Sequence, residues 1–188
     1  MMDKKRLAKI AVPLVIFLLV AGVWFLKNRG TVARVPVDIQ ADAAAKVPPL
    51  ANDPNFTLHT ERIDLEVLSA YELPMILDFG SDSCVPCIEM APVLETMNAE
   101  MQGKAIIRFV DVWKHTNGAD GFPIQVIPTQ VLLNSDGTPY VPGVAVERAG
   151  IRFTMYSTKD TNEHAFTVHQ GSLTEEQMRL ILKDMGVV

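Results

Sequence analysis

Residues 75–92 read MILDFGSDSCVPCIEMAP and change their hydrophobic pattern part-way. The first five are apolar apart from Asp78, which predicts a buried strand. Over 84–101 the apolar side chains recur at helical spacing, which predicts a helix directly after the strand. Both cysteines of the chain, Cys84 and Cys87, fall at the start of that helix.

The spacing of the two cysteines indicates redox chemistry. Two thiols can neither build a disulfide scaffold nor supply the four ligands of a structural zinc site. A helix N-terminus stabilises a thiolate through the helix dipole and the free backbone N–H groups. We therefore expect Cys84 to act as the nucleophile, and Cys87, one turn later, to resolve the resulting mixed disulfide.

The segments around this unit predict an α/β fold. Residues 105–112 and 127–133 predict two more buried strands, and 173–185 predict a closing helix. Strands that alternate with helices predict a central sheet, at least partly parallel, flanked by helices. Between 138 and 163 this alternation stops. Two alternating stretches around turn-like residues predict an elaborated hairpin, inserted at one sheet edge before the last strand.

The charge distribution separates the N-terminal part from the rest. The whole chain has 17 basic and 22 acidic residues, a net charge of −5, which gives no electrostatic support for nucleic-acid binding. Residues 1–27 hold five of the basic residues and one acidic residue. The remainder therefore has 12 basic and 21 acidic residues, a balance of −9.

An uncharged apolar run predicts a membrane anchor. Residues 10–26 span about 25 Å as a helix, close to the thickness of a bilayer core. We expect a basic cytoplasmic N-terminus over 1–9, a linker over 27–56 and a globular domain over 57–188. A slight excess of basic residues before the run favours an extracytoplasmic globular domain. A cleavable signal peptide is the alternative reading of the run.

The motifs together resemble the thioredoxin family. Asp78 six residues before the first cysteine, then Cys84-Val85-Pro86-Cys87, then Ile127-Pro128-Thr129 follow the family's order, and the resemblance covers about 58–185. It implies a thioredoxin-like fold with a central mixed sheet. It also implies that Pro128 is a cis-proline facing the disulfide, and that Ile127 offers its backbone to an extended substrate.

The resemblance also implies roles for other residues. Asp78 matches the buried acid that assists proton transfer at the second cysteine, and burial should raise its pKa toward the range useful for that transfer. Gly171, Val85 and Pro86 are implied to line the substrate surface. No cofactor and no metal site are expected.

Four positions depart from the family's common pattern. Gly80 and Ser83 stand where tryptophans are usual, and Val85 replaces a glycine. Asp82 places a carboxylate near Cys84, which should oppose formation of the thiolate. Because the residues in and around this motif tune its redox potential, a potential cannot be transferred from cytosolic thioredoxin.

These inferences predict a membrane-tethered, extracytoplasmic oxidoreductase that reduces disulfides in protein substrates. Resemblance to the tethered thioredoxin-like proteins of cytochrome c maturation suggests a membrane thiol transporter of the CcdA/DsbD kind as electron donor. A disulfide oxidase or isomerase is one alternative. A copper chaperone that holds Cu(I) with Cys84, Cys87 and a third ligand is another, although the four histidines are scattered along the sequence.

Overall fold

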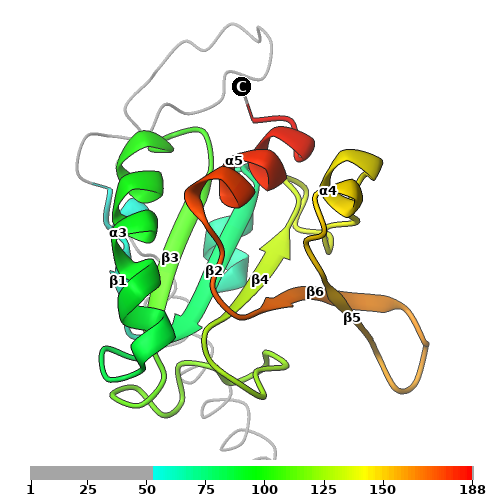
Figure 1. Ribbon diagram of the computed structural model, residues 1–188. Helices are drawn as coiled ribbons and strands as arrows, with labels where there is room; N and C mark the ends of the chain where they lie inside the picture. Colours follow the sequence, from blue (N-terminus) through cyan, green and yellow to red (C-terminus); the bar gives the residue numbers. More distant parts are fainter. Residues whose placement is uncertain (1–52, 188) are drawn as a thin grey trace, which may run out of the picture. The chain divides into compact units, whose positions relative to one another are not determined.

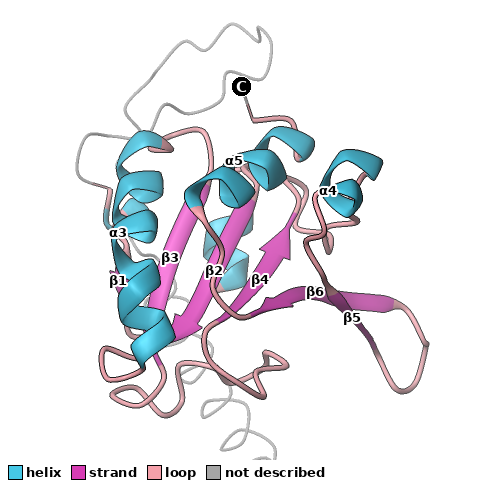
Figure 2. Ribbon diagram, viewed as in Figure 1, coloured by secondary structure: helices cyan, strands magenta, loops and turns pink. Residues whose placement is uncertain are grey.

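The computed structural model describes residues 53–187, and a six-stranded mixed sheet forms the centre of this domain (Figures 1 and 2). Its order is β1-β3-β2-β4-β6-β5, with β1, β3 and β2 parallel and the other neighbours antiparallel. The strands are β1 (His59–Thr60), β2 (Met75–Gly80), β3 (Ile106–Asp111), β4 (Thr129–Leu133), β5 (Thr154–Ser157) and β6 (His164–Gln170). The mixed, thioredoxin-like sheet expected from the sequence is confirmed.

Helices cover both faces of this sheet, as the apolar runs of the strands require. They are the 3₁₀ helix η1 (Pro54–Phe56) and the α-helices α2 (Leu65–Ser69), α3 (Val85–Glu100), α4 (Val144–Arg148) and α5 (Glu175–Asp184). One face packs against α3 and α5 in a core that includes Ile76, Ile107 and Leu132. The other packs Leu77 and Phe79 together with Leu68 of α2.

The two long helices begin and end where their sequences predict. Cys84 is the N-cap of α3, and Pro86 lies in the first turn, where a missing N–H costs little. Helix α5 begins with a capping box, in which Thr174 and Gln177 bond each other's backbone N–H. Gly186 follows this helix with φ +88°, a conformation that favours glycine.

The predicted hairpin is present, but its composition differs from the expectation. β5 and β6 pair antiparallel at the sheet edge, and β6 is itself the last strand, which pairs with β4. The hairpin projects from the sheet in Figure 1. The segment before it contains α4, which the sequence analysis did not predict. Five residues with one fully buried side chain, Val146, are too few to show a helical period.

The predicted cytoplasmic N-terminus, membrane segment and most of the linker lie outside the described residues. Within residues 53–187, no helix combines the length and the apolar character needed to cross a bilayer. The described structure therefore concerns the globular domain, for which the sequence predicted a start at residue 57. The described structure begins slightly earlier, with η1, which packs the side chain of Phe56 into the core.

Candidate functional site

A tight turn delivers the first cysteine from β2 to α3. The N–H of Cys84 donates to the carbonyl of Ser81 at 3.1 Å, and the N–H of Ser83 donates to the Ser81 hydroxyl at 3.2 Å. The carbonyl of Cys84 then accepts the first helical bond, from Ile88 N–H at 2.9 Å. Cys84 thus lies at the N-terminus of a 16-residue helix, where the dipole favours a thiolate.

Cys84 and Cys87 form a disulfide, with their Cα atoms 5.2 Å apart. Cys84 is 9% exposed and Cys87 is 4% exposed, so the first cysteine is the more accessible residue of the two. A nucleophile must reach its substrate, whereas a resolving thiol needs to reach only its neighbour. The assignment of Cys84 as nucleophile and Cys87 as resolving cysteine stays a prediction.

Two further segments converge on the disulfide. The Ile127–Pro128 peptide bond is cis, and the Cys84 sulfur lies 3.9 Å from the Ile127 carbonyl oxygen. Gly171 donates its N–H to the Pro128 carbonyl at 2.9 Å, which joins the loop after β6 to the proline. The Ser172 hydroxyl donates to the Pro86 carbonyl at 3.1 Å and ties this loop to α3. The structure therefore brings together all the positions that the resemblance singled out around the disulfide.

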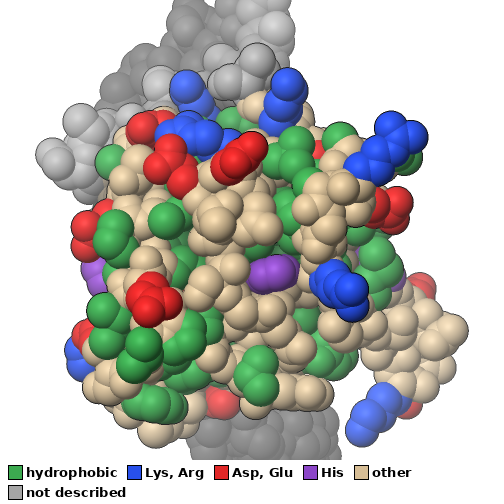
Figure 3. Space-filling model, in the orientation of Figure 1, with side chains coloured by type: hydrophobic (Ala, Val, Ile, Leu, Met, Phe, Trp, Pro, Cys, Tyr) green, Lys and Arg blue, Asp and Glu red, His purple; other side chains and the backbone are tan. Residues whose placement is uncertain are grey.

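The surface beside the disulfide is apolar. Val85 is 66% exposed and Ile88 is 51% exposed, both on the first turns of α3, and Val126 is 52% exposed just before the cis peptide. Figure 3 shows hydrophobic side chains gathered at the lower end of the face, the end where α3 begins in Figure 1. Charged side chains are more frequent at the opposite end of the same view. An apolar partner segment would bury this surface favourably.

Asp78 is the buried acid of the site. It is 1% exposed, and the Gln130 side-chain amide donates to its Oδ1 at 2.5 Å. Burial raises the pKa of Asp78 to about 7, and the hydrogen bond from Gln130 opposes part of that rise. Gly80 lies two residues further along the same face and close to Cys87. A Cβ atom added to Gly80 would be 3.2 Å from the Cys87 sulfur. Asp78 therefore has the pKa of a proton acceptor at neutral pH and lies on the face that Cys87 covers.

The glycine that replaces a tryptophan has a structural reason in this protein. A Cβ on Gly80 would lie 2.8 Å from the ring of Phe109 as well as 3.2 Å from the Cys87 sulfur. Real Cβ contacts are essentially never that close to a ring, so any side chain at this position requires its neighbours to shift. Phe109 and Cys87 occupy the space that a side chain would need.

The charge near the first cysteine has a partner that the sequence did not indicate. Asp82 forms an ion pair with Lys114, which lowers the net negative charge expected to oppose the Cys84 thiolate. The buried carboxylate of Asp111 accepts the N–H groups of Asp82, Trp113 and Lys114, each at 3.0 Å. Burial alone would raise the pKa of Asp111, but these hydrogen bonds and Lys114 hold it below its usual value. Asp111 thus ties the turn before Cys84 to the end of β3.

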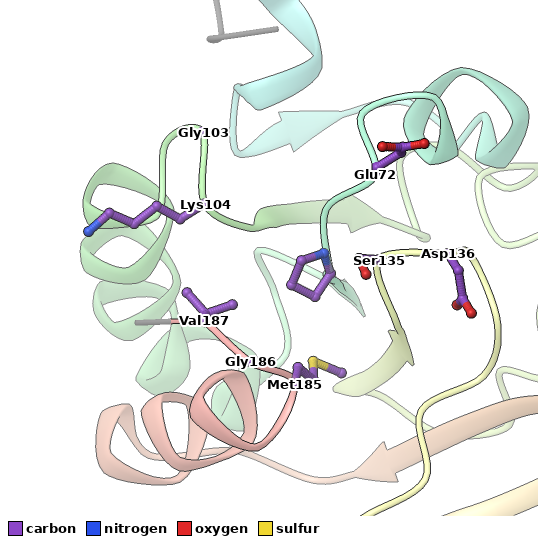
Figure 4. Close-up of a pocket in the computed structure, with 9 residues that line it drawn as sticks. Glu72, Gly103, Lys104, Ser135, Asp136, Met185, Gly186 and Val187 are labelled. Carbon is purple, nitrogen blue, oxygen red and sulfur yellow. The ribbon is translucent and has the colours of Figure 1, made fainter. Parts of the chain in front are cut away.

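Two cavities differ in their relation to the disulfide. The one beside it has a volume of 210 Å³ and a mainly apolar lining that includes Cys87, Ile88 and Phe109. A larger cavity of 530 Å³ lies at the other end of β2 and α3 (Figure 4), where Glu72, Lys104, Asp136 and Met185 are among its lining residues. Because α3 is about 24 Å long, the larger cavity is remote from the sulfur chemistry. The smaller one belongs to the site.

Comparison with known proteins places the site in a family. The family model described as thioredoxin matches residues 55–152. The chain belongs to the thioredoxin family. It is 29% identical over 94 residues to mitochondrial thioredoxin of Mus musculus, covering 44% of this chain and 57% of that protein. It is 33% identical over 67 residues to thioredoxin 1 of Chlorobaculum tepidum, covering 36% of this chain and 66% of that protein.

A further relative has a higher identity over a similar length. Thioredoxin C-2 of Corynebacterium nephridii is 39% identical over 77 residues, covering 41% of this chain and 69% of that thioredoxin. The match to the mitochondrial protein and to thioredoxin 1 spans less than two thirds of either relative. Family membership therefore rests on the thioredoxin domain.

Sequence reasoning missed Gln130, Asp111 and Lys114 among the residues of the site. Gln130 follows Thr129 in an otherwise apolar strand, and a lone amide in a buried strand is the signal that would have found it. Asp111 ends β3 as the last residue of a buried strand, where a carboxylate often meets loop N–H groups. Among residues 53–187, no group of three or more His, Cys, Asp or Glu side chains is arranged to hold a metal ion.

Proposed function

We propose that this protein is a thiol–disulfide oxidoreductase that reduces disulfides in protein substrates outside the cytoplasm. The observation that carries the proposal is the Cys84–Cys87 disulfide, which lies at the N-terminus of α3 beside the cis Ile127–Pro128 bond. A disulfide between residues three apart closes and opens with little movement of the backbone. Membership of the thioredoxin family supports the same chemistry.

The reaction proceeds through two exchanges. The Cys84 thiolate attacks one sulfur of the substrate disulfide, forming a mixed disulfide and releasing the other substrate sulfur as a thiolate. The Cys87 thiol then gives its proton to the Asp78 carboxylate, and the new thiolate attacks the Cys84 sulfur. This second exchange forms the Cys84–Cys87 disulfide and releases the remaining substrate thiolate. The substrate gains two electrons, and the dithiol loses two.

Asp78 suits the proton transfer because of its pKa. An acceptor with a pKa of about 7 is substantially ionised at neutral pH yet binds a proton more readily than an exposed aspartate does. Burial is the cause, since the ionised form loses its hydration. Cys87, the resolving cysteine, is also buried, with 4% of the residue exposed.

Substrate binding uses the surface that surrounds Cys84, the more exposed of the two cysteines. An extended segment of the partner would lie along Ile127, whose carbonyl is 3.9 Å from the Cys84 sulfur. Apolar side chains of that segment would contact Val85 and Val126, which are exposed on either side. This mode combines main-chain hydrogen bonds with side-chain contacts, as in other recognition of extended peptides.

The location and the electron donor belong to the same proposal. The apolar run at 10–26 anchors the chain in the membrane, with the basic N-terminus on the cytoplasmic side. Outside the cytoplasm a reductase lacks access to cytoplasmic reductants, so its disulfide needs electrons that cross the membrane. A membrane thiol transporter of the CcdA/DsbD kind is the donor that fits this arrangement, and a tether keeps the domain near it.

Reduction of insulin disulfides by the full chain tests the activity. We expect the wild-type protein to turn over with dithiothreitol as the electron source, Cys84→Ser to be inactive, and Cys87→Ser to accumulate mixed disulfides with its substrates. Ser83→Ala, at an exposed neighbouring position, is the control that should retain activity. If Cys84→Ser turns over at the wild-type rate, the proposal is wrong. If the Cys84–Cys87 pair oxidises reduced proteins but does not reduce insulin, the result would favour the oxidase or isomerase alternative.

Labelling of the two native cysteines tests the location. A maleimide that does not cross membranes should modify the dithiol in intact spheroplasts after mild reduction. Modification that requires lysis would place the domain in the cytoplasm. Deletion of residues 1–26 should release the protein from the membrane fraction if that segment is the anchor.

A further inference from the structure

Gln130 lies between the acid of the site and the helix that carries the cysteines. It is in register with Asp78 on the neighbouring strand β4, and both side chains are fully buried or nearly so. Its Nε2 donates to Asp78 Oδ1 at 2.5 Å and lies 3.6 Å from the sulfur of Met90, on α3. The amide therefore contacts the acid on one side and the cysteine-bearing helix on the other.

Packing alone does not account for an amide at this position. Gln130 Oε1 is buried and has no hydrogen-bond partner among the described residues. An unpaired buried carbonyl carries a desolvation cost that an apolar side chain of the same length would avoid. The one strong polar contact of the amide is with Asp78. An unsatisfied buried polar group calls for an explanation, and a catalytic role is one of the recognised ones.

Asp78 has no cationic partner within residues 53–187. The elements packed on its face contribute Phe109 from β3, Cys87 and Met90 from α3, and Met178, Ile181 and Leu182 from α5. Across the sheet from Asp78, beyond Gln130, the next titratable group is His169 of β6, which is in register with Gln130. Its Nδ1 is 2.8 Å from the Arg152 carbonyl, and burial lowers its pKa, so it is predominantly neutral at pH 7. Gln130 is thus the side chain that favours the charged form of Asp78.

We propose that Gln130 is a positioning residue, whose amide holds the Asp78 carboxylate on the face covered by Cys87 and stabilises its ionised form. The inference rests on the proposed function, in which Asp78 accepts the proton of Cys87. A neutral donor stabilises the carboxylate without forming a permanent ion pair, so the acid can still bind a proton. Gln130 thereby sets the pH range in which Cys87 resolves the mixed disulfide.

Titration of Asp78 in the oxidised full-length protein tests the inference without any electron transfer. The probe is the ¹³C shift of the Asp78 carboxyl carbon, identified by its loss in Asp78→Asn. Gln130→Met keeps the length of the side chain and removes the donor. We expect Gln130→Met to raise the pH midpoint of the Asp78 titration by about one to two units. This is the range expected for loss of a hydrogen bond to a charged group. Gln130→Asn, which withdraws the amide by one methylene, should shift it in the same direction.

A matched variant controls for the loss of a buried amide. Asn98 of α3 donates to the carbonyls of Phe56 and Ile107 at 2.9 and 2.8 Å, so Asn98→Leu removes a structural amide elsewhere in the domain. It should lower stability and leave the Asp78 midpoint unchanged. An unchanged midpoint in folded Gln130→Met, or an equal shift in Asn98→Leu, overturns the inference.

The kinetic readout separates this inference from the proposed function. In the wild-type protein, the pH dependence of mixed-disulfide resolution should follow the Asp78 midpoint, and Gln130→Met should move both by the same amount. In an Asp78→Asn background, Gln130→Met should have no further effect on the pH profile. If the protein does not reduce insulin but Gln130→Met still moves the midpoint of the Asp78 carboxyl titration, the proposed function fails while the Gln130–Asp78 coupling stands. If insulin is reduced and the midpoint does not move, only the role of Gln130 is wrong.

Discussion

Replacing Asp78 with asparagine should stabilise the protein at neutral and alkaline pH. The folded-state pKa of Asp78 is about 7, against 3.8 for an unperturbed aspartate. Below pH 3.8 the Asp78 carboxyl is protonated in both the folded and the unfolded state, so the stability that its raised pKa contributes is fully present. As the pH rises to about 7, only the folded state holds the proton, so this contribution is progressively lost. The difference of about three pH units, at 1.36 kcal/mol each, amounts to about 4 kcal/mol.

The assay is urea unfolding of the oxidised full chain at several pH values between 4 and 9. Asp78→Asn keeps an oxygen that can accept the Gln130 amide, so the comparison isolates the charge. The free energy of unfolding of the variant minus that of wild type should be small at pH 4 and grow to about 4 kcal/mol above pH 7. Insulin reduction by the variant should slow at the same time, because asparagine cannot accept the proton of Cys87.

Asp111→Asn is the control with the opposite sign. The pKa of Asp111 lies below its usual value, so its carboxylate stabilises the folded state at neutral pH and that stabilisation is lost only in acid. Asp111→Asn should therefore be less stable than wild type at pH 7. A stability difference for Asp78→Asn that does not change with pH, or a loss of stability above pH 7, would refute the argument from burial.

Two glycines give further predictions. Gly80→Ala places a Cβ against the Phe109 ring and the Cys87 sulfur, and should lower the free energy of unfolding by about 1–3 kcal/mol, measured with urea. Gly171 has φ +108°, which side chains rarely adopt, and its N–H bonds the Pro128 carbonyl. Gly171→Ala should cost about 1–2 kcal/mol in thermal unfolding although no atom lies near the added methyl. Wild-type stability in either variant would contradict the corresponding argument.

Much of the fold follows from short-range patterns in the sequence. The continuous apolar runs of β2 and β3 indicate strands buried on both faces, and the structure shows every residue of both strands buried. The capping pattern before α5 and the glycine after it predict the ends of that helix. Such features depend on neighbours a few residues apart, so the chain reveals them without knowledge of its tertiary contacts.

Segments with weak local patterns were harder to predict. Helix α4 spans five residues, and the order in which β5, β6 and β4 pair depends on contacts between distant parts of the chain. An alternating pattern indicates a strand but not its partner, because any half-buried strand presents the same alternation. The hairpin was therefore expected, while its inclusion of the last strand was not.

The chain by itself determined the chemistry of this protein: two thiols three residues apart, at the start of a helix, with an acid in the preceding strand. Only the tertiary structure decided how that chemistry is tuned. Gln130 lies 52 positions from Asp78 and Lys114 lies 32 from Asp82, yet each pair is in contact. The physical reason is that a pKa depends on burial and on charges and donors nearby in space, which the folded chain brings together from distant positions.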